Sequence, residues 1–493
     1  MPQRSCPRCP ALKRLVAALE AEIAGLRVEA EQRRAEVAML RAENATLREK
    51  LTENSRNSSK PPSSDPTSHP RHPQRPSNGR PRRQRPPGAQ RGHRGSHRKL
   101  VDNPDRVCAV DAHRCEKCGG RHLTRTEGAP QRHQVVEIPA APREVVEWQR
   151  YEALCLDCDY RFWPELPADV PLGGFGPRLQ ATIAYFTGTL WLSRRAAEQS
   201  VGDLYGVPIS LGSVSATEAV VSAVIATPVD DAHDAACAQP VAGIDETGWR
   251  HHHGKAWLWA FCTAVATVFM VATNRGDVAF RALVRGFHGI LVSDRWVVYD
   301  AWDMAKRQLC WAHLERMWQK FVDRGGPSAQ IGRALLEDTH RMFHWWHKVR
   351  DGTMTRKRFR LHMLPVIERV QTLLDRGMTL RAHAKTRRTC TRIRKLAPAL
   401  WTFIEVEGVE PTNNATERVV RMGVQWRARS LGTQSDAGRE YVARMLTATA
   451  TLRRHGRNVY EYLVEAMNNH LHGIPAPSLL RDVETTKTTV QAA

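Results

Sequence analysis

The sequence lacks an apolar run long enough to span a bilayer, and it opens on no signal-peptide pattern. We therefore expect a cytoplasmic protein without a membrane partner. In the reducing cytosol, its 11 cysteines are better explained as thiols or metal ligands than as disulfides. The 493 residues are enough for several domains and at least one large core.

Acidic residues are scarce in two stretches of the chain. Residues 60–99 contain 11 Lys or Arg and one acidic residue, and residues 326–404 contain 17 against 5. These stretches account for the entire net charge of +22. Because solvated surfaces usually mix both signs, this concentration favours a nucleic-acid partner over a role in solubility alone. A membrane surface is disfavoured, since no amphipathic anchor accompanies the charge.

The first basic stretch also lacks Val, Ile, Leu, Phe, Met and Trp, and it contains nine prolines. Nothing in it can form a core, so residues 53–106 are predicted to be a disordered or extended arm. Its arginines suit contacts to DNA phosphates without sequence readout. The arginines assigned to DNA binding are Arg80, Arg82, Arg83, Arg85, Arg91 and Arg94. A plain flexible linker is the alternative, and both descriptions can hold.

Apolar residues recur at heptad spacing over residues 10–52, with Leu at most d positions and Val or Ile at several a positions. Asn44 is the single polar residue at an a position. This pattern predicts a parallel, two-stranded coiled coil that joins two copies of the chain. The alternative is one long helix packed on its own protein. We assign residues 1–52 to oligomerisation.

Two Cys-x-x-Cys pairs follow the arm, Cys115 with Cys118 and Cys155 with Cys158. Two such turns with β-type residues between them are the layout of a four-thiolate zinc ribbon. The gap between the pairs is longer than in many ribbons. We predict one structural Zn²⁺ that holds together a small domain of residues 107–170.

Residues 171–238 have a helical pattern that contains a helix, a glycine turn and a second helix. Gly206 is expected to end the first helix, and Ser210 or Ser213 to cap the second. This fits a helix-turn-helix DNA reader in which Ser213 and Ser215 contact the groove. Plain helix packing explains the pattern equally well.

From residue 239 the pattern changes to strands. Three apolar runs, a short amphipathic helix and a fourth apolar run form the opening of a ribonuclease-H-like fold, whose first and fourth strands are parallel neighbours. Asp245 lies on the first strand and Asp294 near the end of the fourth, so both can share a metal ion. We assign residues 239–325 to a catalytic core within a multidomain α+β protein.

A third carboxylate, Glu417, opens a helix after the second basic stretch. The alternative explanation is a capping box, because Glu417 lies three residues after Asn414. Arg418 and Arg421 follow on the same helix and suit DNA contact. The remaining predicted segments are a basic helical insertion with its aromatic residues in a core, a second part of the catalytic core, and a tail: residues 326–404, 405–455 and 456–493.

Rival carboxylates lie close to the first two acids, namely Glu246, Asp300 and Asp303. Asp245 and Glu246 point to opposite faces of a strand, so only one of them can face the site. The sequence alone leaves this choice open.

Several motifs are specific enough to compare with known families. They are NSSKPPSSD, the paired Cys-x-x-Cys, DETGW, QLCWAHLERMW, NNATERVVR and RSLGTQSDAGREYVARML. Together they resemble the C-type transposases of bacterial insertion sequence 66, over nearly the whole chain. The resemblance implies a DDE-type DNA transposase in a bacterial cytoplasm, associated with the nucleoid. It carries over Asp245, Asp294 and Glu417 as the catalytic, metal-binding triad.

Such an enzyme holds two Mg²⁺ or Mn²⁺ ions per active site, which activate water and then a DNA 3′-hydroxyl without a covalent protein intermediate. Its implied partners are the terminal inverted repeats, target DNA, a second copy of the chain, and accessory proteins of the same element. One alternative is a non-catalytic DNA-binding and assembly protein derived from such a transposase. Another is an RNA-directed nuclease on the same fold.

Two histidine motifs complete the candidate residues. The resemblance places Cys310-x-x-His313 beside the site, where we expect Cys310 to be packed and His313 to contact substrate phosphate. The run of three histidines from His251 to His253 is expected to be a solvated turn, because consecutive side chains on a strand alternate in direction.

Overall fold

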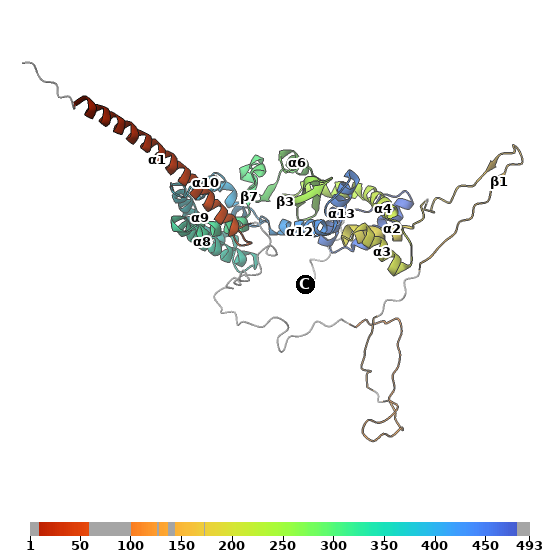
Figure 1. Cartoon of the computed structure of the whole chain (residues 1–493). Coiled ribbons are helices and arrows are strands. Elements are labelled where there is room, and N and C mark those ends of the chain that lie inside the picture. Colours follow the sequence, from red (N-terminus) through yellow and green to blue (C-terminus); the bar gives the residue numbers. More distant parts are fainter. Residues whose placement is uncertain (1–8, 59–99, 126–127, 137–142, 172, 481–493) are drawn as a thin grey trace, which may run out of the picture.

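The computed structural model describes residues 9–58, 100–125, 128–136, 143–171 and 173–480. Within these residues the chain is a helix-rich α+β protein with one five-stranded sheet (Figure 1). The six arginines assigned to the arm lie outside the described residues.

The sheet contains the strands expected from the sequence and one more. Its strands are β3 (Val241–His251), β4 (Gly254–Cys262), β5 (Thr267–Ala272), β6 (Ile290–Ser293) and β7 (Arg307–Leu309), with α6 (Asp277–Leu283) between β5 and β6. The order across the sheet is β5-β4-β3-β6-β7. The first three strands are antiparallel, whereas β6 is parallel to β3 and β7 is parallel to β6. The expected parallel pairing of the first and fourth strands is therefore confirmed.

Two helices from the end of the chain pack on this sheet, namely α12 (Asn414–Ser430) and α13 (Asp436–Arg454). Their approach is close, because a Cβ atom at Gly423 would lie 2.0 Å from Leu258 Cδ2. On β5, the Phe269 N–H donates to Thr447 Oγ1 at 2.9 Å. The sheet and these helices share one apolar core that includes Ile244 and Trp259.

The helical segment before the sheet contains α2 (Pro177–Ala184), a π-helix (Tyr185–Thr189), α3 (Arg194–Tyr205), α4 (Leu211–Val224) and α5 (Ala226–Cys237). As expected, Gly206 ends α3 in a left-handed conformation, and Ser210 caps α4 by accepting from the Ser213 N–H. The predicted tail differs from the structure, because α14 (Val459–Leu471) packs against α2 and buries Leu463. Its apolar face gives this segment a place in the main core.

The basic insertion is helical, as predicted. Its helices are α8 (Gly326–Arg350), α9 (Arg356–Met378), α10 (Ala384–Lys395) and α11 (Thr402–Glu405), and together with the preceding α7 (Trp311–Asp323) they surround a second apolar core. The insertion aromatics belong to it, with Trp346 buried and Phe343, Trp345 and Trp401 packed against it. This core also takes Val292 of β6 and Leu309 of β7, so the insertion is joined to the parallel edge of the sheet.

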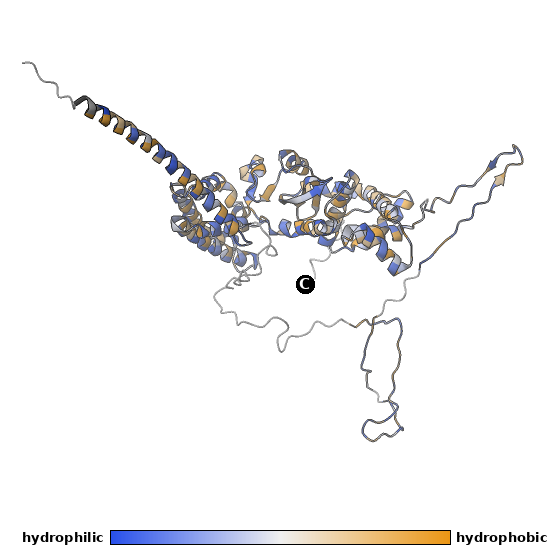
Figure 2. Cartoon of the chain, viewed as in Figure 1, coloured by the Kyte–Doolittle hydropathy of each residue, from blue (hydrophilic) through white to orange (hydrophobic). Residues whose placement is uncertain are grey.

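A single helix, α1 (Cys9–Leu51), covers the predicted heptads and extends away from the other elements (Figure 1). Hydrophobic and hydrophilic residues alternate along it (Figure 2), and its heptad leucines are exposed, for example Leu19 by 51% and Leu26 by 58%. Over most of its length, α1 does not pack against the rest of the chain, in contrast to the alternative of a long helix packed on its own protein.

The predicted arm begins folded rather than extended. Asn57 is buried, its Nδ2 donates to Asp323 Oδ2 of α7 at 2.8 Å, and its Oδ1 accepts from the Asn54 N–H at 2.9 Å. Ion pairs from Glu49 to Arg324 and Lys385 attach the end of α1 to the insertion. Asparagine side chains, which supply backbone-like hydrogen bonds, explain why this polar turn is ordered.

No single described helix is long and apolar enough to cross a membrane. Taken together, α4 and α5 reach the length and apolar composition of a membrane span, but the pair is bent by 46°.

Candidate active site

The pairing of β3 with β6 places two acids side by side. Gly243 lies opposite Val292 in this parallel register. Two residues further along each strand direction come Asp245, still within β3, and Asp294, which directly follows β6. The two carboxylates therefore stand at the same level of neighbouring strands. The Asp294 carboxylate also accepts from the Trp296 N–H at 2.7 Å, which fixes its orientation.

Glu417 reaches the same region on the first turn of α12. Just before that helix, Asn413 donates to the Ile244 carbonyl oxygen at 2.7 Å, next to Asp245 in the chain. A Cβ atom at Gly243 would lie 2.1 Å from Thr416 Oγ1, so only glycine permits this contact. The structure also excludes the capping box: α12 has no side-chain cap, and Glu417 Oε1 has no hydrogen-bond partner among the described residues.

The three carboxylates influence one another electrostatically. Burial raises the pKa of Asp245 well above its ordinary value, and the nearby charges of Glu246, Glu417 and Asp294 raise it further. Their oxygens are not gathered as tightly as in the clusters described below, in which all ligand atoms lie within 4.8 Å. Because the charges of Glu417 and Asp294 raise the pKa of Asp245, a cation bound between these carboxylates would be stabilised.

The rival carboxylates have other partners in the structure. Glu246 accepts two hydrogen bonds from Arg275, at 2.8 and 2.6 Å, and another from the Tyr299 hydroxyl. Asp300 pairs with the fully buried Arg307 at 2.8 Å. Asp303 is exposed and caps a short turn by accepting from Ala305.

The buried Arg307 was not singled out from the sequence, although it positions the loop after β6. Its Nη2 donates to the Asp294 carbonyl oxygen at 2.9 Å, and its Nε donates to Ser293 Oγ at 3.2 Å. Arg392 of α10 donates to the Arg295 carbonyl oxygen at 2.8 Å, which connects the insertion to the same loop. An arginine at the start of a short strand gave no sequence signal of this role.

Cys310 and His313 lie beside Glu417. The ligand atoms of these three residues lie within 4.8 Å of one another, and His313 Nδ1 is 3.4 Å from Glu417 Oε1. Complete burial raises the pKa of Cys310 to about 12, so it remains a thiol, as its predicted packing role requires. Burial and the neighbouring Arg316 lower the pKa of His313, which favours a neutral imidazole. Arg316, also 3.8 Å from Glu417, was not anticipated from the sequence.

The two Cys-x-x-Cys turns have the same backbone form. In the first turn, the Cys115 N–H donates to the Gly120 carbonyl oxygen and the Gly119 N–H donates to that of Cys115. In the second turn, the Cys155 N–H donates to Tyr160 and the Asp159 N–H donates to Cys155 in the same way. Backbone N–H groups at each turn lower the pKa of Cys115 and of Cys155, which favours thiolates. The structure does not bring the two cysteine pairs together. Among the residues described from 100 to 171, the only strands are the short β1 (Ala153–Leu154) and β2 (Arg161–Phe162).

The candidate DNA contacts differ in exposure. Arg418 and Arg421 are exposed on α12, and neither forms an ion pair within the described ranges. Ser213 and Ser215 are half-buried on α4, which contains no Lys or Arg. Ser213 Oγ is also bonded to Ser210 Oγ at 3.0 Å.

Comparison with known families identifies two segments. The model of the Transposase IS66 family matches residues 173–441, which is more than half of the chain. A family of unknown function, DUF6444, matches residues 6–99. No curated protein matches the chain.

Proposed function

The chain belongs to the IS66 transposase family, and on that premise we propose that it is a DDE-type transposase. In this proposal it binds the ends of an insertion sequence, cleaves DNA strands with divalent metal ions, and transfers them to a target. The observation that carries the proposal is the register that sets Asp245 level with Asp294, together with the delivery of Glu417 by α12.

The sheet supports a ribonuclease-H-like core. Three antiparallel strands are followed by two parallel ones in the order β5-β4-β3-β6-β7. In this arrangement the first and fourth strands of the core are central neighbours. Residues at their corresponding positions can act on one substrate.

The residues fit divalent cations. Carboxylate oxygens are the ligands that Mg²⁺ and Mn²⁺ prefer. Burial and repulsion raise the pKa of Asp245, and Glu417 Oε1 accepts no hydrogen bond among the described residues; a cation held by Asp245, Asp294 and Glu417 would relieve both. When bound, such ions supply activation of the attacking oxygen and stabilisation of the leaving oxygen.

The surrounding side chains assist without supplying a nucleophile. Because its pKa is about 12, Cys310 stays protonated and forms no covalent DNA intermediate. A neutral His313 can donate one N–H to a phosphate, and Arg316 adds positive charge on the same helix. Glu246 is held by Arg275 and Tyr299, which leaves Asp245 as the β3 carboxylate for metal.

DNA is proposed to contact positive charge on both sides of the site. Arg418 and Arg421 project from the helix of Glu417. Helix α10 of the insertion carries six Arg or Lys, and one of them, Arg392, contacts the loop that follows Asp294. Backbone contacts of this kind position DNA without reading its sequence. The arginines from Arg80 to Arg94, and groove contacts by Ser213 and Ser215, remain predictions of the sequence.

Two further modules belong to the proposal. The exposed heptads of α1 suit pairing with a second copy, as transposition of two element ends requires. The two cysteine turns suit thiolate ligation of one Zn²⁺, which would bring them together. Accessory proteins of the same element are expected as additional partners.

The deciding experiment is cleavage of labelled DNA that carries the element's own ends, with Mg²⁺ or Mn²⁺. Asp294→Asn should reduce cleavage to background while a gel-shift assay still detects binding to the ends. Asp303→Asn is the matched control, because this nearby carboxylate is exposed and asparagine preserves its cap. It should cleave like the wild type.

Other outcomes have clear meanings. Equal cleavage by Asp294→Asn and the wild type would refute the site. Binding without cleavage by the wild type, with its accessory proteins supplied, would favour the non-catalytic DNA-binding and assembly protein.

A further inference from the structure

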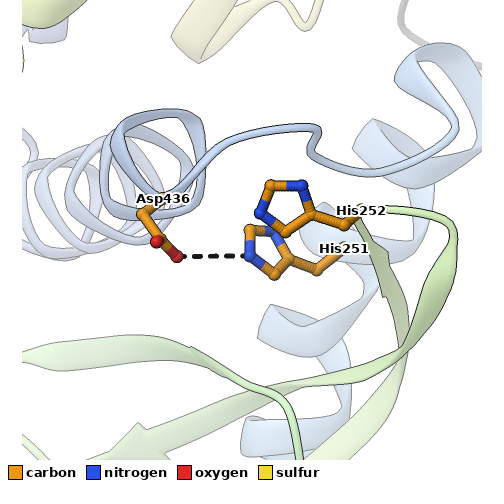
Figure 3. A group of neighbouring side chains, drawn as sticks. All are labelled: His251, His252 and Asp436. Carbon is orange, nitrogen blue, oxygen red and sulfur yellow. Dashed lines mark ion pairs between the residues drawn. The ribbon is translucent and has the colours of Figure 1, made fainter.

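A second group of metal-binding side chains lies at the far end of β3. His251 ends this strand, His252 begins the turn to β4, and Asp436 begins α13 (Figure 3). One ligand atom from each lies within 4.8 Å of the others. The expectation of a solvated turn holds for His252, which is exposed, but His251 is buried at the end of the strand and the two side chains do not diverge. His252 has a φ of 46°, and this left-handed conformation turns its ring toward that of His251, with centroids 4.2 Å apart.

The hydrogen bonds of Thr433 fix the orientation of the His251 ring. The Thr433 hydroxyl donates to the Arg250 carbonyl oxygen at 3.4 Å and accepts from Trp249 Nε1 at 3.3 Å. The same hydroxyl is hydrogen-bonded to His251 Nδ1 at 3.0 Å, which holds the ring in place whichever ring nitrogen carries the proton. The other ring nitrogen, Nε2, therefore points away from Thr433 toward a second neighbour.

That neighbour is the Asp436 carboxylate, with Oδ1 at 3.2 Å from His251 Nε2 (Figure 3). Nε2 and Oδ1 can hold either the ring's own proton or a metal ion between them, and Arg439 Nη2 pairs with the same Oδ1 at 3.1 Å. Zinc bonds of about 2.0–2.1 Å to nitrogen and oxygen, at a tetrahedral angle, separate two ligand atoms by about 3.3 Å. The observed spacing matches this value.

We propose that His251, His252 and Asp436 bind a transition-metal ion such as Zn²⁺, distinct from the catalytic ions and from the cysteine turns. Histidine nitrogens with one carboxylate are a typical ligand set for zinc, and Thr433 orients the first ligand as an outer partner. His252 and Asp436 are exposed, so water can complete the coordination.

The site would join two elements that carry catalytic residues. His251 lies on the strand of Asp245, and Asp436 follows the short loop after α12, the helix of Glu417. Backbone hydrogen bonds already link these elements: the His252 N–H donates to the Thr433 carbonyl oxygen at 3.0 Å, and the Thr433 N–H donates to the Arg250 carbonyl oxygen at 2.9 Å. A bound ion would reinforce this junction.

Zinc titration of the full chain tests the site. The titration uses protein carrying Glu417→Gln, with its cysteine sites already loaded with zinc, and without Mg²⁺ or DNA. The Glu417→Gln change removes a ligand shared by the catalytic carboxylates and the Cys310 group. In this background we expect one calorimetric binding event. His252→Ala or Asp436→Asn should weaken it at least about tenfold.

Matched controls come from the same two elements. His253→Ala and Glu440→Gln alter exposed residues of the turn and of α13, and both should keep the binding event. Absence of the event before further substitution, or equal affinity after His252→Ala, would overturn the proposal and leave His251 and Asp436 as a simple ion pair. Neither result depends on DNA cleavage, so failure here is separate from failure of the proposed function.

Discussion

Among single residues, Asp245 has a clear cost in stability, because its carboxylate is buried beside other acids. Its carboxylate is buried near three other acids, and these surroundings raise its pKa. A raised pKa in the folded state means that folding is favoured when the group is protonated. The contribution is complete below the unfolded pKa, near 4, and is lost as pH rises through the folded pKa.

We therefore predict that Asp245→Asn stabilises the protein in buffer without Mg²⁺. Its advantage over the wild type in free energy of unfolding should grow with pH from about 4 to neutrality, with each tenfold change in the acid dissociation constant corresponding to about 1.4 kcal/mol. Urea titrations at several pH values measure this difference. Added Mg²⁺ should narrow it by stabilising only the wild type, and a difference independent of pH would contradict the account.

At this scale the sequence predicted identities better than environments. The positions of Asp245 on a strand, Asp294 at the end of a strand and Glu417 at the start of a helix predicted a shared site, although the choice of Asp245 over Glu246 came from the family resemblance. The partners of Glu246 were hidden, since Arg275 and Tyr299 are distant in the chain. The meeting of His251 and His252 was also hidden, because it depends on a left-handed turn rather than on alternation.

Among the elements, α1 is the one whose regularly spaced apolar residues are left exposed to solvent. Its heptad leucines are exposed along a helix that contacts the protein chiefly at its end, through Glu49. Burying such residues is the main driving force for pairing of helices. A partner helix would bury the heptad leucines that the chain itself leaves exposed.

We predict that Leu19→Glu combined with Leu26→Glu lowers the oligomer mass, measured by light scattering. Both substitutions leave the docked end of α1 intact. Val28→Glu is the control, since Val28 is 56% exposed but lies outside the a and d positions. An unchanged mass for the double variant would show that α1 does not mediate assembly.

Strands and helices were largely predictable from apolar periodicity, whereas their partners were not. The three strands, helix and fourth strand follow from local patterns, and so do the caps at Gly206 and Ser210. The predicted tail contains α14, which enters the main core by packing against α2. Contacts between such distant segments leave no mark in local sequence.

At the scale of the whole molecule, the two Cys-x-x-Cys turns lie apart, and each offers two thiols. One zinc ion shared by four thiolates would require the segments around Cys115 and Cys155 to meet. We predict that Cys115→Ser and Cys155→Ser each remove the same single equivalent of zinc, measured by atomic emission. Cys108→Ser, at an exposed cysteine outside both turns, should retain it. If each turn lost its own equivalent independently, a shared ribbon would be excluded.

The position of α12 in the chain has a consequence for biosynthesis. Asp294 precedes the insertion and Glu417 follows it, so the triad is incomplete until α7 to α11 have been made and folded. Domains generally fold as they emerge, the N-terminal parts first. A nascent or truncated chain ending before α12 would carry α1 and much of the basic charge, yet lack Glu417, the proposed third metal ligand. If the basic segments bind DNA and α1 pairs two copies, as proposed, such fragments would compete with intact copies, and incomplete translation would lower the rate of transposition.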